Sequence, residues 1–116
     1  MLTGVKVIIV EDSFVVAHSL GCLLEGFGCE VVGKAANVQD ACVLAENAEF
    51  DVAILDINLG GVLVTEVARK TEAKGARIVY LTGFSGPDLL PEDLRSHRCL
   101  AKPVRADDLV AAILGT

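Results

Sequence analysis

The chain has 116 residues, of which 53% are hydrophobic and 22% are charged, and it contains 3 prolines. This size and composition suit one folded domain over residues 1–116 and exclude a polar, disordered chain. The formal net charge of −6 argues against direct binding of nucleic acid or of an anionic lipid surface. No apolar run approaches the roughly 20 residues of a membrane span, so we expect a cytoplasmic protein without a membrane partner.

The first half of the chain alternates between strand and helix patterns. Residues 5–10 form an apolar, β-branched run, and Ser13 and Gly28 bracket a stretch with apolar residues at three- and four-residue spacing. A second strand is predicted at residues 30–33, followed by the same helical spacing, and a third at residues 51–55. Within the first and third runs, residues 7–10 and 52–55 are continuously apolar, which is typical of parallel strands covered on both faces.

The second half repeats the alternation. A helix ending before Gly75 is followed by predicted strands at residues 77–81 and 99–101, and Ala106 opens a last helix with two acids in its first turn. Between those strands the prolines leave room for only a short helix, at residues 91–96. Five strands joined by four right-handed helical crossovers predict an α/β fold with a parallel sheet covered on both faces.

Polar residues stand where the predicted strands end. The first strand ends at Glu11 and Asp12, the third at Asp56, the fourth at Thr82 and the fifth at Lys102. Ligands of such sheets bind outside the carboxyl ends of the strands, so we expect these five side chains to converge on one edge.

Each of these residues also has a simple structural interpretation. The first two acids suit a helix N-terminus, Thr82 suits a hydroxyl bonded to backbone, and Lys102 suits a surface charge. Three facing carboxylates, however, would repel one another unless a cation lay between them. An oxygen-rich, partly hydrated site favours Mg²⁺, so the joint placement predicts a magnesium site.

Four short fragments carry a family resemblance, namely Val10-Glu11-Asp12, Leu55-Asp56, Leu81-Thr82-Gly83 and Ala101-Lys102-Pro103. Through their order and spacing, essentially the whole chain resembles the receiver domains of bacterial two-component response regulators. The resemblance implies a flavodoxin-like (βα)5 three-layer sandwich with a five-stranded parallel sheet in the order 2-1-3-4-5.

The same resemblance implies a phosphorylated signalling switch and not a turnover enzyme. A histidine kinase, a histidine phosphotransfer protein of a phosphorelay or a small acyl phosphate would transfer a phosphoryl group onto Asp56, and contacts with a downstream protein would then change. Asp12 would bind Mg²⁺ directly and Glu11 mainly through its water, with Asp56 and the backbone carbonyl of Asn58 as further ligands. The remaining two site residues, Lys102 and Thr82, would hold phosphoryl oxygens.

Several positions depart from the commonest family pattern. Cys99 lies three positions before Lys102, where family members usually have an aromatic switch residue. Gly60, followed by Gly61, occupies the position four residues after Asp56 where a proline is often found. We expect a mobile glycine loop, and signalling through residues 83–97 with Phe84 as the apolar reporter. The run of residues 80–84 resembles the Phe-Ala-Thr-Gly motif of single-domain receivers from alphaproteobacteria.

The chain contains four cysteines, Cys22, Cys29, Cys42 and Cys99. They form no C-x-x-C pair, and neither His18 nor His97 completes a metal-ligand spacing. We interpret them as reduced, mostly buried thiols, and Cys99 as a small core residue in preference to a redox group.

Three other functions stay open. A pseudo-receiver would bind partners without being phosphorylated. A haloacid-dehalogenase-type phosphatase also uses an aspartyl nucleophile with Mg²⁺, although its second aspartate would fall on Asn58; turnover of phosphomonoesters would reveal it. A flavodoxin-like redox function is disfavoured because Glu11 and Asp12 repel phosphate where a flavin-binding loop attracts it.

Overall fold

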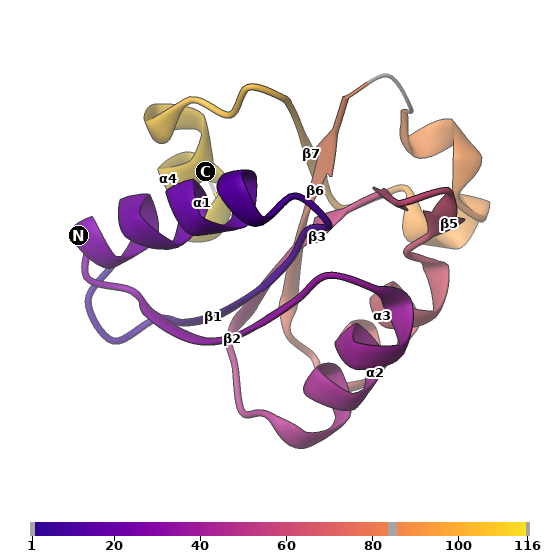
Figure 1. Ribbon diagram of the computed structural model, residues 1–116, viewed down its shortest axis with the longest axis horizontal. Coiled ribbons are helices and arrows are strands. Elements are labelled where there is room, and N and C mark those ends of the chain that lie inside the picture. The colour runs from indigo at the N-terminus through magenta and orange to yellow at the C-terminus, as the bar shows by residue number, and fades with distance from the viewer. Residues whose placement is uncertain (1, 84–85, 116) are drawn as a thin grey trace.

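A five-stranded parallel sheet forms the centre of the molecule (Figure 1). The structure is a computed structural model that describes residues 2–83 and 86–115. The strands are β1 (Lys6–Val10), β2 (Glu30–Ala35), β3 (Val52–Asp56), β6 (Arg77–Thr82) and β7 (Arg98–Ala101). They lie in the order β2-β1-β3-β6-β7, and each neighbouring pair is parallel. The predicted flavodoxin-like order is thereby confirmed.

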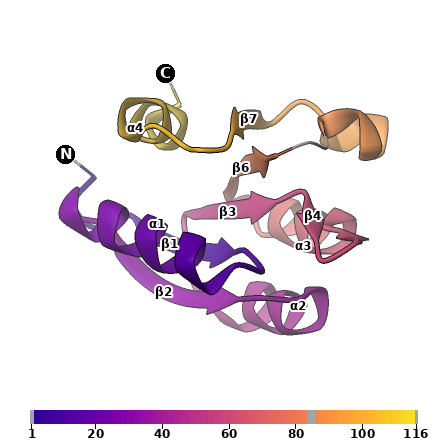
Figure 2. The same cartoon turned by 45° about the horizontal axis from the view of Figure 1, so that its top comes forward.

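Helices cover both faces of this sheet (Figures 1 and 2). One face packs against α1 (Phe14–Gly26) and α4 (Ala106–Leu114), and the other against α2 (Val38–Asn47) and α3 (Thr65–Ala73). Alternate residues of β1 enter the two cores, with Ile8 on the side of α2 and Ile9 on the side of α1. The apolar stretches 7–10 of β1 and 52–55 of β3 are accordingly the buried centre, as their sequence pattern predicts.

The predicted helix ends are largely confirmed. Ser13 caps α1, because its hydroxyl accepts a hydrogen bond of 3.3 Å from the Val16 N–H. Gly28 and Gly75 follow the ends of α1 and α3, and α4 begins at Ala106. The longest helix, α1, has 13 residues, so no helix in the described part of the chain is long enough to cross a membrane.

The connection from β6 to β7 corrects one prediction. In place of a helix at residues 91–96, its described part holds two short 3-10 helices, Pro87–Leu89 and Glu92–Leu94. Between them Leu90 is extended, with φ −86° and ψ 156°, because the residue before a proline is disfavoured in helical conformation. Phe84, expected as the apolar reporter, lies outside the described residues.

A small hairpin that was not predicted follows β3. It pairs β4 (Asn58–Leu59) with β5 (Val62–Leu63), antiparallel, around Gly60 and Gly61. These glycines have φ of +58° and +94°, and a two-residue type I′ turn requires positive φ at both positions. The Asn58 side chain accepts a 2.7 Å hydrogen bond from the Gly61 N–H, which braces the turn. The mobility expected for this loop stays a prediction.

Candidate functional site

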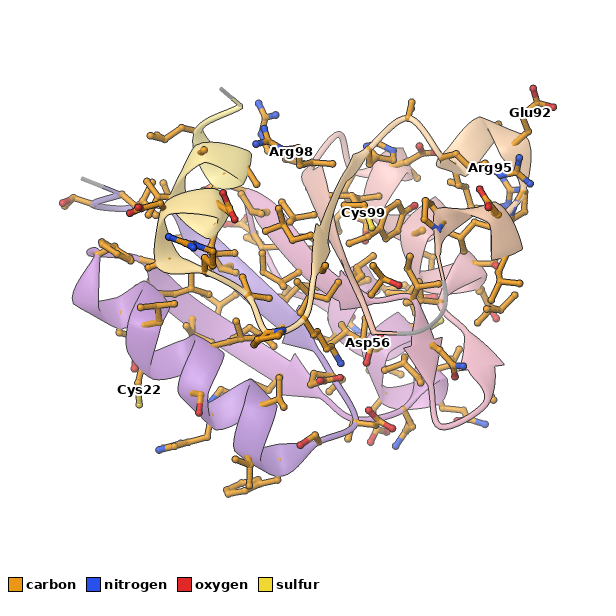
Figure 3. The ribbon with its side chains drawn as sticks, turned by 90° about the horizontal axis from the view of Figure 1, so that it is seen from above. Cys22, Asp56, Glu92, Arg95, Arg98 and Cys99 are labelled. Carbon is orange, nitrogen blue, oxygen red and sulfur yellow. The ribbon has the colours of Figure 1, made fainter. Side chains whose placement is uncertain are left out.

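Lys102 joins two acidic residues at the carboxyl edge of the sheet, one of which, Asp56, is labelled in Figure 3. Its Nζ lies 2.6 Å from Glu11 Oε1 and 2.8 Å from Asp56 Oδ2. Glu11 follows β1, Asp56 ends β3 and Lys102 follows β7, so three strands bring these groups together. The predicted convergence of these residues is present.

Both carboxylates of this cluster are buried. Glu11 is 2% exposed and Asp56 is 5% exposed. Burial raises the pKa of Glu11 to about 7, and its hydrogen bond with Asp56 adds to the shift. Burial alone would lower the pKa of Lys102, but the hydrogen bonds and charges of Asp56 and Glu11 outweigh it and raise that pKa. Lys102 is therefore held as a cation, and Glu11 retains a proton more readily than an exposed carboxyl group.

Asp12 completes an acidic group that suits a cation. Carboxylate oxygens of Glu11, Asp12 and Asp56 all lie within 4.8 Å of one another. Asp12 is exposed, and its backbone N–H donates to Glu11 Oε2 at 3.1 Å. All three donors are oxygen atoms and the exposed side admits water, which is the ligand set that Mg²⁺ prefers. The residues present therefore fit the ion that the sequence predicts.

Asn58 lies beside this group through its backbone. Its N–H donates to Asp56 Oδ1 at 3.2 Å. The hairpin tip also approaches the acids, since a Cβ added to Gly60 would lie 3.8 Å from Asp12 Oδ2. The hairpin places Asn58 next to the phosphoacceptor candidate, and the role of its carbonyl as a ligand stays a prediction.

Thr82 ends β6 next to the lysine. Its carbonyl accepts a 2.8 Å hydrogen bond from the Lys102 N–H. The Thr82 hydroxyl is buried and has no hydrogen-bond partner among the described residues, so the simple interpretation of a hydroxyl bonded to backbone is wrong. An unsatisfied buried hydroxyl is costly. Because the Thr82 hydroxyl has no partner, it is free to donate a hydrogen bond to a group that enters the site.

Tyr80, two residues before Thr82, holds the crossover onto the sheet, a role that the sequence did not indicate. Its fully buried side chain donates from the hydroxyl to the carbonyl of Leu94 at 2.9 Å. Burial raises the pKa of Tyr80 to about 12, so the hydroxyl keeps its proton. The hydrogen bond spans 14 residues, and no local spacing signals such a contact.

Cys99 pairs with Tyr80 across the β6–β7 register and is partly buried. Burial raises the pKa of the Cys99 thiol, which disfavours the reactive thiolate and supports a core residue. All four cysteines are free; Cys29 and Cys42 are buried, whereas Cys22 is exposed. The thiols are thus mostly buried, as expected, with Cys22 as the exposed exception.

Comparisons with known sequences and structures agree with one another. A family model described as the response regulator receiver domain matches residues 7–114. The chain is 35% identical over 114 residues to the transcriptional regulatory protein PdtaR of Mycobacterium tuberculosis and 34% identical over 112 residues to DesR of Bacillus subtilis. These alignments cover 93% and 94% of this chain but 54% and 56% of the relatives. The chain thus spans about half the length of these curated relatives.

Two solved structures are similar along nearly the whole chain. The solution structure of SdrG from Sphingomonas melonis Fr1 is 34% identical, with a TM-score of 0.81 and coverage of 95% of this chain and 96% of that one. A crystal structure of a response regulator protein from Burkholderia pseudomallei contains a phosphorylated aspartic acid, a calcium ion and citrate. It is 25% identical, with a TM-score of 0.77 and coverage of 94% of this chain and 66% of that one.

Proposed function

The chain belongs to the response regulator receiver domain family of two-component signalling, and we propose on this basis that Asp56 accepts a phosphoryl group in the presence of Mg²⁺. The observation that carries the proposal is the contact of Lys102 with Asp56 inside a group of three carboxylates. A similar protein, the response regulator from Burkholderia pseudomallei, contains a phosphorylated aspartic acid and a calcium ion. The donor is a phosphohistidine on a histidine kinase or a histidine phosphotransfer protein.

Asp56 acts as the nucleophile in this transfer. One of its oxygens forms the new bond to phosphorus while the P–N bond of the phosphohistidine breaks, and the imidazole leaves with that electron pair. Lys102, already 2.8 Å from Asp56 Oδ2, is in place to pair with a phosphoryl oxygen. Bound Mg²⁺ would supply positive charge against the phosphoryl oxygens, held by Glu11, Asp12, Asp56 and the Asn58 carbonyl.

Thr82 supplies the difference between the two states. Its hydroxyl is buried without a partner among the described residues, and a phosphoryl oxygen on Asp56 would accept its hydrogen bond. A group can shift a conformational equilibrium only by making different contacts in the two states. The unpaired hydroxyl provides such a difference, because it gains a partner only on phosphorylation.

An apolar groove beside the site supports a protein donor. It has a volume of about 610 Å³, and Lys102 and Gly83 contribute to its lining. Its apolar walls come from α1 and from the segment after β7, through Val15, Val16, Leu20, Leu23, Pro103 and Val104. A helix of the phosphohistidine protein placed there would bring the phosphoryl group to the edge where Asp56 lies.

We treat the domain as a signalling switch whose only chemistry is to accept a phosphoryl group on its own aspartate and to lose it again. The phosphatase alternative needs a second catalytic aspartate, which falls on Asn58. The Asn58 side-chain oxygen accepts a hydrogen bond from Gly61, and a carboxamide is no general acid. The site therefore favours a phosphoacceptor over a phosphomonoesterase.

Incubation with acetyl phosphate and Mg²⁺, followed by intact mass measurement, tests the proposal. We expect the wild-type chain to gain the mass of one phosphoryl group. Asp56→Asn should keep its circular dichroism spectrum and gain no such mass, because a carboxamide cannot form an acyl phosphate. Asp12→Ala should bind Mg²⁺ much more weakly, whereas Lys102→Ala should keep Mg²⁺ binding and lose the response to phosphorylation. Phosphoryl mass on Asp56→Asn would overturn the assignment.

A further inference from the structure

A second group of metal-ligating side chains lies on α1, apart from the acidic site. His18 Nε2 and Cys22 Sγ are 3.6 Å apart, and both residues are exposed. Figure 3 shows Cys22 projecting from α1 away from the sheet. The receiver function described above uses neither side chain, so this pair is available for other chemistry.

We propose that His18 and Cys22 chelate a borderline-soft divalent transition metal, of which Zn²⁺ is the reference case. In a tetrahedral zinc site the Zn–S distance is about 2.3 Å and the Zn–N distance about 2.0–2.1 Å. A tetrahedral angle then places the two ligand atoms about 3.6 Å apart, which matches the observed separation of 3.6 Å. The two ligand atoms therefore already have the separation that a tetrahedral zinc site requires, before any metal binds.

The helix explains why the two ligands meet. Residues four positions apart lie on one helix face, and pairs at this spacing bind zinc in helical motifs. Both His18 and Cys22 lie inside α1, which runs from Phe14 to Gly26, so their four-residue spacing places them on one helix face. A chelate with both ligands on one helix needs no movement of the fold.

The Phe14 ring lies beside the His18 imidazole. The two rings stack, with centroids 6.1 Å apart and an interplanar angle of 11°. Restricting the orientation of a ligand before binding lowers the entropic cost of binding. The Phe14 side chain is itself 83% exposed, and this stack on the metal-binding face gives it a function.

The donor set separates this site from the acidic one. Sulfur and nitrogen ligands select transition metals, whereas carboxylates select Mg²⁺. Two protein ligands leave the remaining coordination positions to water, which makes the bound metal exchangeable, unlike that of a closed structural site. On binding, the Cys22 thiol releases its proton and the thiolate becomes the ligand, so affinity increases as pH rises.

Titration of the full chain with Co²⁺ under reducing conditions tests the site. We expect a near-ultraviolet sulfur-to-cobalt charge-transfer band that saturates as a single class of site and is reversed by Zn²⁺. Cys22→Ser should abolish the band. His18→Ala should weaken Co²⁺ binding roughly tenfold or more, since even partners that only orient a ligand contribute 10–100-fold. Both positions are exposed on a helix, and circular dichroism checks that both variants fold.

Two controls make the result specific. Cys99→Ser removes a partly buried thiol and should leave the band unchanged. Asp12→Ala removes an oxygen ligand of the acidic site and should also leave it unchanged, so failure of the phosphoacceptor proposal would not affect this result. The chelate would be overturned by the absence of a sulfur band in the wild-type chain, by a full band in Cys22→Ser, or by unaltered affinity in His18→Ala.

Discussion

At the scale of single residues, folding changes the side-chain pKa of Glu11. Its side chain is buried, accepts from Lys102 and from the Asp12 N–H, and faces Asp56. Loss of hydration is the main reason that its pKa is raised to about 7 from the ordinary value of 4.5. Folding therefore increases the affinity of Glu11 for a proton, and protonation in turn stabilises the fold.

We predict that this residue makes stability fall as pH rises from about 4.5 to about 7. In that window the unfolded chain has released the proton of Glu11 while the folded chain retains it, so the unfolded state binds fewer protons. The contribution is complete below the unfolded pKa and lost above about 7, with a size of at most roughly 3 kcal/mol. Urea unfolding at pH 5 and pH 7.5 measures it.

Glu11→Gln should remove most of that pH dependence, because the amide does not titrate and can still accept from Lys102. Glu49→Gln is the matched control, since Glu49 is an exposed glutamate. An unchanged pH slope in Glu11→Gln would show that Glu11 does not hold the proton.

At the scale of elements, the crossover between β6 and β7 is anchored without an α-helix. Leu90 and Leu94 are buried, at 1% and 0% exposure. The Arg95 guanidinium donates to the carbonyls of Leu90 and Asp88 at 2.9 and 3.0 Å. Tyr80 donates to the Leu94 carbonyl. These contacts fix the position of the two 3-10 helices. Through Tyr80 they also connect the crossover to β6, close to Thr82.

We predict that phosphorylation changes this crossover more than it changes α4. Beryllofluoride with Mg²⁺ serves as the phosphoryl mimic, and amide exchange with and without it provides the measurement. Exchange should change most in residues 86–97. A Thr82 hydroxyl drawn toward Asp56 would shift the end of β6, and Tyr80 on that strand donates to the Leu94 carbonyl in the crossover. Tyr80→Phe should raise exchange in that segment without the mimic, since the buried Leu94 carbonyl loses its donor at a cost of about 1–3 kcal/mol. Changes confined to α4 would contradict the prediction.

At the scale of the whole molecule, the acidic site and the apolar groove share one side. The groove is lined by α1 and by the segment after β7, and Lys102 belongs to both features. Val15, on its α1 wall, is 72% exposed. A protein donor would bury this surface, whereas a small acyl phosphate needs only the acidic site.

We predict that Val15→Glu separates the two kinds of donor. Phosphotransfer from a phosphorylated histidine kinase that labels the wild-type chain should fall roughly tenfold, since a charge buried at the contact costs more than 1 kcal/mol. Phosphorylation by acetyl phosphate should not change. Val43→Glu, at a 59% exposed position on α2, should alter neither rate. Equal loss with both donors would place Val15 in the site itself and not in the docking surface.

Local patterns in the amino-acid sequence were sufficient to predict the five-stranded sheet, most of the helices around it and the edge where the site lies. Strands and helix ends depend on neighbouring residues, as in the apolar runs at β1 and β3 and the cap at Ser13, so spacing alone reveals them. Because parallel strands end at a common edge, the residues that close them could also be grouped into one site from their positions in the sequence.

The way in which those residues meet depends on tertiary packing. Lys102 contacts Glu11 and Asp56, which lie 91 and 46 positions away, and the raised pKa of Glu11 follows from burial that no local pattern records. The contact of Tyr80 with Leu94 and the splitting of the crossover at Leu90 likewise depend on how a proline-containing segment packs onto β6. Local patterns report which residues lie on a strand or a helix, whereas the proton affinity of Glu11, the unpaired hydroxyl of Thr82 and the contacts of Lys102 depend on neighbours distant in the chain.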